Sequence, residues 1–242
     1  MKLNAIIGIY IKYIYFKFFS KRMMNAKDHQ SICYLREGVK ATIMCKKTIL
    51  LCSLIFSLTL LIPQSIMAQK ILNKGDQAPD FSTEASLDGK AFEFSLKDAL
   101  AKGPVVLYFY PSAYTPGCDL EAHTFSELSG DFKAAHTTII GLSADNIERL
   151  NDFSADPDFC AGNFPVGADE KGTIAATYGL QISGAKEGAK DVRGVNIDHG
   201  FLPRVTFVIG KDGTIIEMFS SEEHGLSPDE HVTKSLAIVQ NL

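Results

Sequence analysis

The sequence predicts an α/β fold in which helices flank a central mixed sheet. Two continuous apolar runs, Pro104–Tyr110 and Thr137–Ser143, have the character of strands buried on both faces, and each precedes a segment of helical periodicity. Further along, Val205–Ile209 and Thr214–Phe219 flank a Gly-Lys-Asp-Gly turn and predict an antiparallel hairpin. Alternating strands and helices, followed by a hairpin and a last helix, predict an α/β sandwich.

The elements before the first buried strand are short. Phe81–Phe94 alternates weakly between apolar and polar residues on either side of Asp88 and Gly89, a pair typical of two-residue turns. This segment predicts an N-terminal β-hairpin, and Ser95–Ala101 predicts a short helix after it.

Two longer helices are expected after the buried strands. Apolar residues repeat at helical spacing at Leu120, Phe125, Leu128 and Phe132. This repeat predicts one amphipathic helix over 118–134. Asp145–Ser154 predicts a second helix, with Asp145 as its N-cap.

The remaining elements follow from shorter patterns. In chain order we expect a strand, a short helix, a glycine- and charge-rich loop and a final helix, at Phe164–Val166, Gly172–Tyr178, Gln181–Gly200 and Ser227–Leu242. Ser227 and Pro228 suit the N-cap and first residue of the final helix, and Glu230 completes a capping box.

The segment before the domain has the order of a secretory signal peptide. Met44–Lys47 is basic, Thr48–Pro63 is a long apolar run, and Ala68 suits the position just before a cleavage site. We therefore expect 44–68 to be a signal peptide that is cut after Ala68. A retained membrane anchor is the alternative, although the apolar run of about 16 residues is shorter than the roughly 20 that a span needs.

The chain therefore divides into three segments. Residues 1–43 are expected to be an upstream segment or the result of a translation start placed too early, 44–68 the signal peptide, and 69–242 a single domain. This organisation predicts an exported protein, either periplasmic or secreted.

The charge of the predicted mature domain is strongly negative. The leader holds ten of the 24 Lys and Arg residues and two of the 28 Asp and Glu residues, which leaves 14 basic and 26 acidic residues and a formal net charge of −12. Such a surface repels nucleic acid and anionic membranes, so we expect no nucleic-acid partner.

Only Cys118 and Cys160 of the five cysteines remain after cleavage. In an oxidising compartment two cysteines most often form a structural disulfide. The chain has no CxxC motif, no GxGxxG or GxxxxGK phosphate loop, and its histidines are scattered without metal-ligand spacing. The sequence therefore predicts neither a metal site nor another cofactor.

Cys118 follows a buried strand, a short loop and a Pro-Gly break, and it opens a predicted helix. A helix N-terminus offers free N–H groups and a partial positive charge, which favour the reactive thiolate. Thr115 precedes it by three residues and is near enough to donate its hydroxyl to the sulfur or to a substrate. Pro111 and Pro116 restrict the loop. Each feature also has a structural interpretation, as a strand end, a helix start or an N-cap, but the combination indicates a nucleophile.

Pro111, Thr115 and Cys118 match the Pro-x-x-x-Thr-x-x-Cys signature of peroxiredoxins. The wider run 108–118, with Glu121 and Ala122, resembles the Q-type group, also called bacterioferritin comigratory protein. The similarity covers most of 71–242. It implies a thioredoxin-like fold and the thiol-dependent reduction of hydrogen peroxide and organic hydroperoxides.

The resemblance also implies roles for five residues. Cys118 would be the peroxidatic cysteine, Thr115 would hydrogen-bond the peroxide, and Pro111 would shield the sulfur from water. Arg204 would stabilise the thiolate and polarise the peroxide oxygen, with an ordinary edge-strand arginine as the structural alternative. Glu121 resembles a partner of that arginine, although a surface carboxylate fits its position nearly as well.

The sequence departs from many Q-type members at one position. His123 stands where they carry a resolving cysteine, five residues after the peroxidatic one. Cys160 is then the candidate resolving cysteine, because some members place it in this later region, and it would form an intrachain disulfide with Cys118. If Cys160 is not involved, an external thiol must complete the cycle. The expected reductant is thioredoxin-like or a small thiol, and the expected state is a monomer or a homodimer.

Two alternatives of other classes remain. A thiol–disulfide oxidoreductase or a copper-handling protein of the same fold needs a second cysteine close to the first, and residues 114–122 contain only Cys118. The other alternative is an exported, non-enzymatic domain that a structural Cys118–Cys160 disulfide holds together. Such a domain would not react with stoichiometric peroxide.

Overall fold

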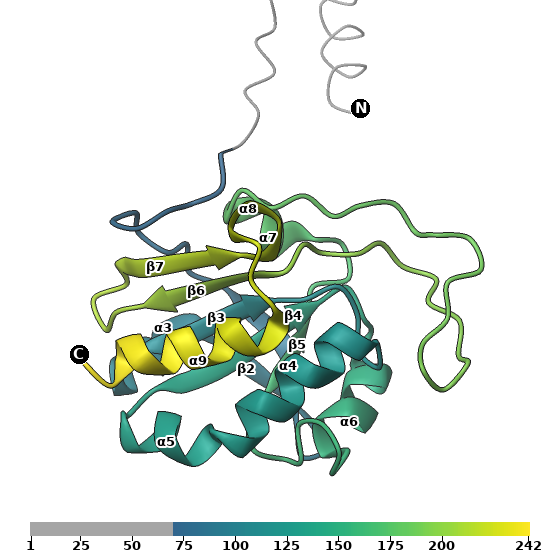
Figure 1. The fold of residues 1–242 in the computed structure, drawn as a ribbon, viewed down its shortest axis with the longest axis horizontal. Helices are drawn as coiled ribbons and strands as arrows, with labels where there is room; N and C mark the ends of the chain where they lie inside the picture. The colour runs from purple at the N-terminus through teal and green to yellow at the C-terminus, as the bar shows by residue number, and fades with distance from the viewer. Residues whose placement is uncertain (1–69) are drawn as a thin grey trace, which may run out of the picture. The chain divides into compact units, whose positions relative to one another are not determined.

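The computed structural model describes residues 70–242, so the predictions for 1–43 and 44–68 lie outside the described residues. Across residues 70–242 a seven-stranded sheet has the order β2-β1-β5-β4-β3-β6-β7 (Figure 1). Its strands are β1 (Ser82–Leu87), β2 (Lys90–Ser95), β3 (Val105–Phe109), β4 (Thr138–Ser143), β5 (Val166–Ala168), β6 (Val205–Ile209) and β7 (Ile215–Ser220). β3, β4 and β5 are parallel and the other pairings are antiparallel, so the sheet is mixed as predicted.

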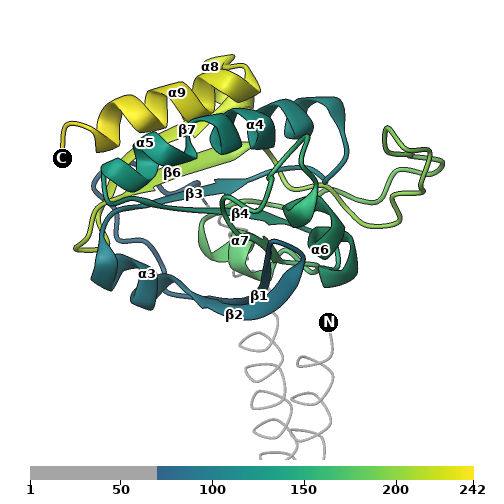
Figure 2. The same ribbon diagram turned by 90° about the horizontal axis from the view of Figure 1, so that it is seen from below.

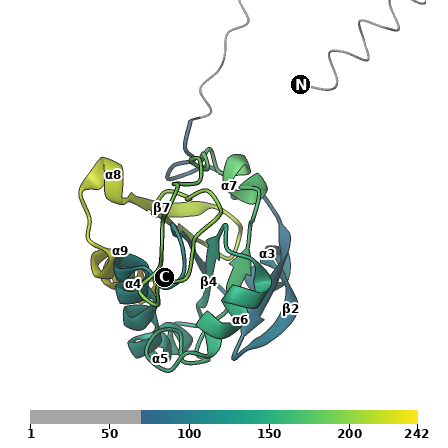
Figure 3. The ribbon, with the colours of Figure 1, turned by 90° about the vertical axis from the view of Figure 1, so that its right-hand side faces the viewer.

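Helices cover both faces of this sheet. They are α3 (Leu96–Lys102), α4 (Pro116–Glu127), α5 (Ser129–Ala134), α6 (Ile147–Ala155), α7 (Thr173–Thr177), α8 (Ser221–His224) and α9 (Pro228–Val239). α4, α5, α6 and α9 contribute to the core on one face, whereas α3 and α7 contribute to the core on the other. Figure 2 shows α4, α5 and α9 together on the side of the sheet opposite α3. α4 and α9 lie side by side (Figure 3). No helix of residues 70–242 combines the length and apolar character that crossing a membrane needs.

The central strand β3 is buried on both faces, as its continuous apolar run predicts. Val106 and Tyr108 belong to the core beneath α4 and α9, and Val105, Leu107 and Phe109 belong to the core beneath α3 and α7. This alternation follows from the two-residue period of a strand. The end of β3 lies between the two hydrophobic cores, and the loop to α4 starts at that point.

The predicted N-terminal hairpin is confirmed. β1 and β2 pair antiparallel across Asp88 and Gly89, which have positive φ angles of 50° and 72°. Two consecutive positive φ values define the turn that an Asp-Gly pair favours. β1 also pairs with β5, and this pairing attaches the hairpin to the sheet.

The single helix predicted over 118–134 is wrong, because two helices occupy this stretch. α4 ends at Glu127, and Leu128 has φ −93° and ψ 5°, outside the helical region, before α5 begins at Ser129. Apolar periodicity continues across the break because Phe125 and Phe132 contact the same core. Ser129 and Gly130 form helices poorly, which fits a break at this point.

The predicted N-cap role of Asp145 is also wrong. Asn146 caps α6 instead, and its side-chain oxygen accepts a hydrogen bond from the Arg149 backbone N–H. Asp145 is fully buried one residue earlier. Its carboxylate accepts hydrogen bonds from Ser112, Ala113 and His199, so it is not available to cap the helix.

A long loop between α7 and β6 extends from the sheet (Figures 1 and 2). It includes the predicted glycine- and charge-rich stretch Gln181–Gly200, which forms neither helix nor strand. The Val192 backbone N–H donates to the Tyr114 carbonyl at 2.9 Å, which ties the loop to the segment before α4. The predicted capping box of α9 between Ser227 and Glu230 is confirmed.

Candidate active site

Cys118 lies in the first turn of α4, as predicted. Thr115 is the N-cap residue with extended backbone angles, and Pro116 and Gly117 are the first two helical residues. The Cys118 side chain is 2% exposed. Its sulfur therefore lies in a nearly dry site at the positive end of a helix. A thiolate is more stable there than at a buried position without such a helix end.

The sheet brings Arg204 to this sulfur from 86 residues further along the chain. β6 pairs antiparallel with β3, and Val205 at the start of β6 is opposite Phe109 at the end of β3. Arg204, immediately before β6, therefore reaches the same edge of the sheet as Cys118. Its Nη2 donates to the Cys118 Sγ at 3.3 Å.

Glu121 anchors the other side of the guanidinium. Its Oε2 accepts a hydrogen bond from Arg204 Nη1, one helical turn beyond Cys118. Gly117 makes room for this arrangement, because a Cβ at that position would lie 3.1 Å from Arg204 Nη2. Arg204 thus bridges a thiol and a carboxylate, and the predicted pairing of Arg204 with Glu121 is present in the structure.

Burial and charge oppose one another at the thiol. Burial is the largest effect and raises the pKa of Cys118 above its usual value, although Arg204 opposes the shift. Glu121 adds a smaller upward contribution. The groups around Cys118 therefore stabilise the thiolate against the cost of removing it from water.

The buried carboxylate has an unusual pKa of its own. Glu121 is fully buried, and burial raises its pKa to about 7, although Arg204 lowers it. Its second oxygen, Oε1, has no hydrogen-bond partner among the described residues. Charge on Glu121 therefore depends on the Arg204 contact and changes near neutral pH.

Thr115 and Pro111 occupy the loop that leads into α4. The Thr115 hydroxyl donates to the Ser112 carbonyl at 2.8 Å. Its one hydrogen is thereby used, and the oxygen lone pairs remain free to accept from a substrate O–H. Pro111 is half-buried shortly after β3 and precedes Ser112.

Cys160 shares an apolar core with Cys118, but the two cysteines are not bonded in this structure. Cys160 is fully buried. Burial raises the pKa of its thiol well above the usual value, and Asp156 and Asp119 raise it further. The two thiols thus have similar burial and opposite electrostatic surroundings. His123, in the alternative resolving position, is exposed on α4.

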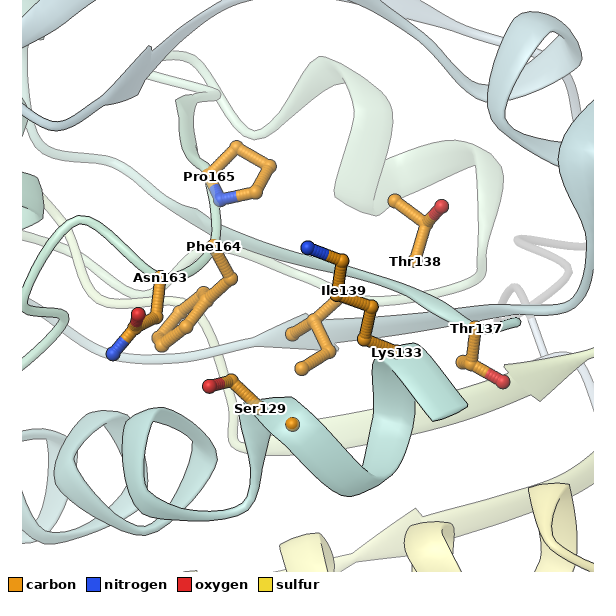
Figure 4. A pocket seen from close by; sticks show the side chains of 9 residues that line it. Ser129, Lys133, Thr137, Thr138, Ile139, Asn163, Phe164 and Pro165 are labelled. Carbon is orange, nitrogen blue, oxygen red and sulfur yellow. The ribbon is translucent and has the colours of Figure 1, made fainter. Parts of the chain in front are cut away.

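A pocket on the same domain lies away from this thiol. Its lining consists of Ser129, Gly130, Lys133, Thr137, Thr138, Ile139, Asn163, Phe164 and Pro165 (Figure 4). Thr138 starts β4, whereas the loop to Cys118 follows the end of the parallel strand β3. The pocket therefore lies at the opposite edge of the sheet and contributes nothing to the thiol site. Among residues 70–242 no group of three or more His, Cys, Asp or Glu side chains is placed to hold a metal ion.

Comparison with known proteins identifies the family. Residues 74–218 match the AhpC/TSA family. The chain belongs to the peroxiredoxins. This peroxiredoxin is 36% identical over 151 residues to a Helicobacter pylori protein named as a bcp peroxiredoxin, a match that covers 61% of this chain and 88% of the relative. It is 30% identical over 173 residues to the chloroplastic peroxiredoxin Q of Oryza sativa subsp. japonica, covering 71% of this chain and 68% of the relative.

A solved structure supports the same assignment. The crystal structure of peroxidoxin BcpB from Mycobacterium tuberculosis superposes with a TM-score of 0.58 at 30% identity, and it covers 71% of this chain and 98% of that one. The thioredoxin-like fold and the Q-type resemblance are thus confirmed. Peroxiredoxins are thiol peroxidases, so this peroxiredoxin is an enzyme. The family match gives no support to the alternative of a disulfide-held, non-enzymatic domain.

Sequence reasoning missed the residues that hold the loop before α4. Ser112 accepts from Thr115, and its hydroxyl donates to the buried Asp145 carboxylate. Asp145 in turn contacts Arg149 and His199. The only sequence signal for this cluster is the position of Asp145 directly after a buried strand, which is equally typical of a helix cap.

The Glu121→Gln substitution tests the electrostatic balance at the thiol. An amide oxygen can still accept from Arg204, but the negative charge that raises the pKa of Cys118 is gone. We expect the pKa of Cys118 to fall, as measured by the ultraviolet absorbance of the thiolate against pH. Glu127→Gln is the matched control, since Glu127 is exposed on the same helix. A higher pKa of Cys118 in Glu121→Gln would contradict the balance described here.

Proposed function

We propose that this peroxiredoxin reduces hydrogen peroxide and organic hydroperoxides by direct attack of the Cys118 thiolate. The observation that carries the proposal is the 3.3 Å contact between Arg204 Nη2 and Cys118 Sγ at the N-terminus of α4. A fixed cation beside a thiol supports both the thiolate and the negative charge that develops on a peroxide oxygen.

The first step forms a sulfur–oxygen bond. The thiolate attacks the terminal peroxide oxygen and the O–O bond breaks. The other oxygen leaves as hydroxide or alkoxide and takes the proton that Cys118 released on ionising, which gives water or an alcohol. Sulfur loses two electrons and becomes a sulfenic acid. Arg204 stabilises the charge on the departing oxygen, and the Thr115 hydroxyl accepts from the peroxide O–H, because its own hydrogen is held by the Ser112 carbonyl.

Two further residues support this step. Glu121 keeps the Arg204 guanidinium in place by accepting a hydrogen bond from Arg204 Nη1, the nitrogen that does not contact the sulfur. Pro111 covers the thiol loop and limits the access of water to the sulfur. The burial of Cys118 favours a site from which bulk water is excluded.

In the second step, we propose that Cys160 resolves the sulfenic acid. Its thiol attacks the Cys118 sulfur, water leaves, and an intrachain disulfide forms. A thioredoxin-like protein or a small thiol then reduces the disulfide by exchange. Both cysteines belong to one apolar core, which supports the pairing, whereas the helical position of Cys118 requires the first turn of α4 to open so that the sulfurs reach bonding distance.

We propose that the enzyme is exported as a monomer or homodimer and has no nucleic-acid partner. The order of basic start, apolar run and Ala68 supports export, and the formal charge of −12 after Ala68 opposes nucleic-acid binding. N-terminal sequencing of the protein from its native host should give Gln69 first. A cytoplasmic form that keeps Thr48–Ala68 would exclude export.

The Cys118→Ser substitution tests the nucleophile. We expect loss of essentially all peroxide consumption in a folded protein, because serine is not ionised at neutral pH. Arg204→Ala should lower the rate constant of Cys118 oxidation by about 10² to 10³, since the leaving oxygen loses its cation. Stopped-flow mixing with hydrogen peroxide and circular dichroism measure both effects. Normal turnover by Cys118→Ser would reject the proposed chemistry.

The Cys160→Ser substitution separates the two cycles. The first oxidation should remain fast, because it uses only Cys118. Turnover with a thioredoxin system should collapse, and Cys118 should over-oxidise to sulfinic acid. Non-reducing peptide mapping of wild type after one equivalent of peroxide should show a 118–160 cross-link. Absence of that cross-link, together with normal turnover of Cys160→Ser on a small thiol, would establish the one-cysteine cycle instead.

A further inference from the structure

The loop between β3 and α4 is held by a buried carboxylate that lies outside the thiol site. Asp145 accepts from the Ser112 hydroxyl at 2.9 Å and from the Ala113 backbone N–H at 2.8 Å. Ser143, at the end of β4, adds a third hydrogen bond at 2.7 Å. A fully buried carboxylate is stable only with such partners. Its position therefore fixes the backbone from which the Thr115 and Cys118 side chains are presented.

His199 supplies a further partner from the segment that leads into β6. Its Nε2 lies 2.8 Å from Asp145 Oδ1, and its Nδ1 lies 2.8 Å from the Gly200 carbonyl oxygen. A carbonyl and a carboxylate can only accept, so both ring nitrogens must donate. The geometry thus requires the imidazolium form of His199.

Arg149 on α6 faces the same carboxylate from the other side. Its Nε lies 2.9 Å from Asp145 Oδ1. Its Nη2 donates to the Ala113 carbonyl at 2.8 Å and lies 2.9 Å from Asp191 Oδ2 in the long loop. Arg193 also pairs with Asp191 Oδ2, at 3.0 Å, so the charged groups that meet here are three cations, His199, Arg149 and Arg193, and two carboxylates, Asp145 and Asp191. The Phe201 ring, 6.0 Å from the His199 ring, is an uncharged neighbour.

We propose that protonated His199 is a positioning residue for the peroxidase reaction, acting through Asp145 on the Ser112–Ala113 backbone. The path is short: His199 binds Asp145, Asp145 binds Ser112, and the Ser112 carbonyl accepts from the Thr115 hydroxyl. The inference rests on the proposed roles of Cys118 and Thr115. His199 does not contact Cys118, but through Asp145 and Ser112 it influences the geometry around the Cys118 thiol.

Protonation makes this control dependent on pH. Burial disfavours the cation, but the hydrogen bonds to Asp145 and Gly200 outweigh it and raise the pKa of His199 above its ordinary value. A raised folded-state pKa gives stabilisation that is complete below the ordinary histidine value of about 6.5 and is lost as pH rises through the folded value. The loop before α4 is therefore held most tightly on the acidic side.

The test compares wild type with His199→Leu and His199→Gln. Leucine removes both donors and the charge, whereas glutamine keeps an N–H donor for Asp145 without a charge. The rate constant of Cys118 oxidation by hydrogen peroxide is measured in single turnover from about pH 5 to about pH 9. His136→Asn is the control, because His136 lies just before β4 at a positive φ of 53°, and asparagine tolerates that conformation.

At acidic pH, His199→Leu should be about 10-fold to 100-fold slower than wild type, since small misplacements of reacting groups have effects of that size. The ratio of wild-type to His199→Leu rates should fall as His199 loses its proton. His199→Gln should lie between the two at low pH, and the wild-type rate should approach the His199→Gln rate as His199 loses its proton. His136→Asn should follow wild type throughout. A ratio that stays constant with pH would reduce His199 to a structural residue and overturn the proposal.

A second measurement needs no variant. In wild type, the His199 ring resonances and the Ser112 and Ala113 amide resonances should shift with one shared midpoint above the ordinary histidine value. The proposal would be overturned if the His199 midpoint were at or below about pH 6.5, or if the Ser112 and Ala113 amide resonances did not shift with it. This holds even if the variants fail to fold. An unreactive Cys118 in wild type would instead reject the proposed peroxide chemistry, so the two failures are distinguishable.

Discussion

The site depends on one guanidinium held between a thiol and a carboxylate. A guanidinium does not lose its proton in a protein, and a buried arginine needs partners that match its forked set of N–H donors. Cys118 and Glu121, one turn apart on α4, provide them. The antiparallel pairing of β6 with β3 delivers Arg204 to that helix. Strand order, the start of α4 and the space left by Gly117 thus belong to a single arrangement around one cation.

A second carboxylate performs a similar task for the backbone. Asp145 follows β4, the parallel neighbour of β3, so the ends of both strands meet at one edge of the sheet. There it accepts hydrogen bonds from the thiol loop and from the segment before β6, and it forms an ion pair with Arg149 of α6. The two carboxylates therefore have different roles. Glu121 holds the Arg204 guanidinium beside the sulfur, and Asp145 fixes the loop that leads to Cys118. Both act because burial makes their hydrogen bonds obligatory.

Local signals in the sequence predict much of this fold. The Asp88–Gly89 turn, the Ser227 capping box and the apolar run of β3 each depend on neighbouring residues alone, and each is confirmed. The motif around Cys118 likewise indicates its place at a helix start. Asp145 is misassigned from sequence because Asp and the following Asn are both good N-caps. The Asp145 carboxylate is taken up by tertiary partners, such as Ser112, 33 residues earlier, and His199, 54 residues later. No periodicity or cap rule carries that information.

The two thiols show how much their surroundings decide. Cys118 and Cys160 are almost equally buried in one core, so desolvation alone would make both unreactive. Cys118 contacts Arg204 at the positive end of α4, whereas the carboxylates of Asp156 and Asp119 raise the pKa of Cys160 further. A thiolate is the nucleophile, and it forms where positive charge offsets the loss of water. On the mechanism proposed above, the placement of Arg204 makes Cys118 the first of the two thiols to react, and Cys160 reacts only after Cys118 has been oxidised.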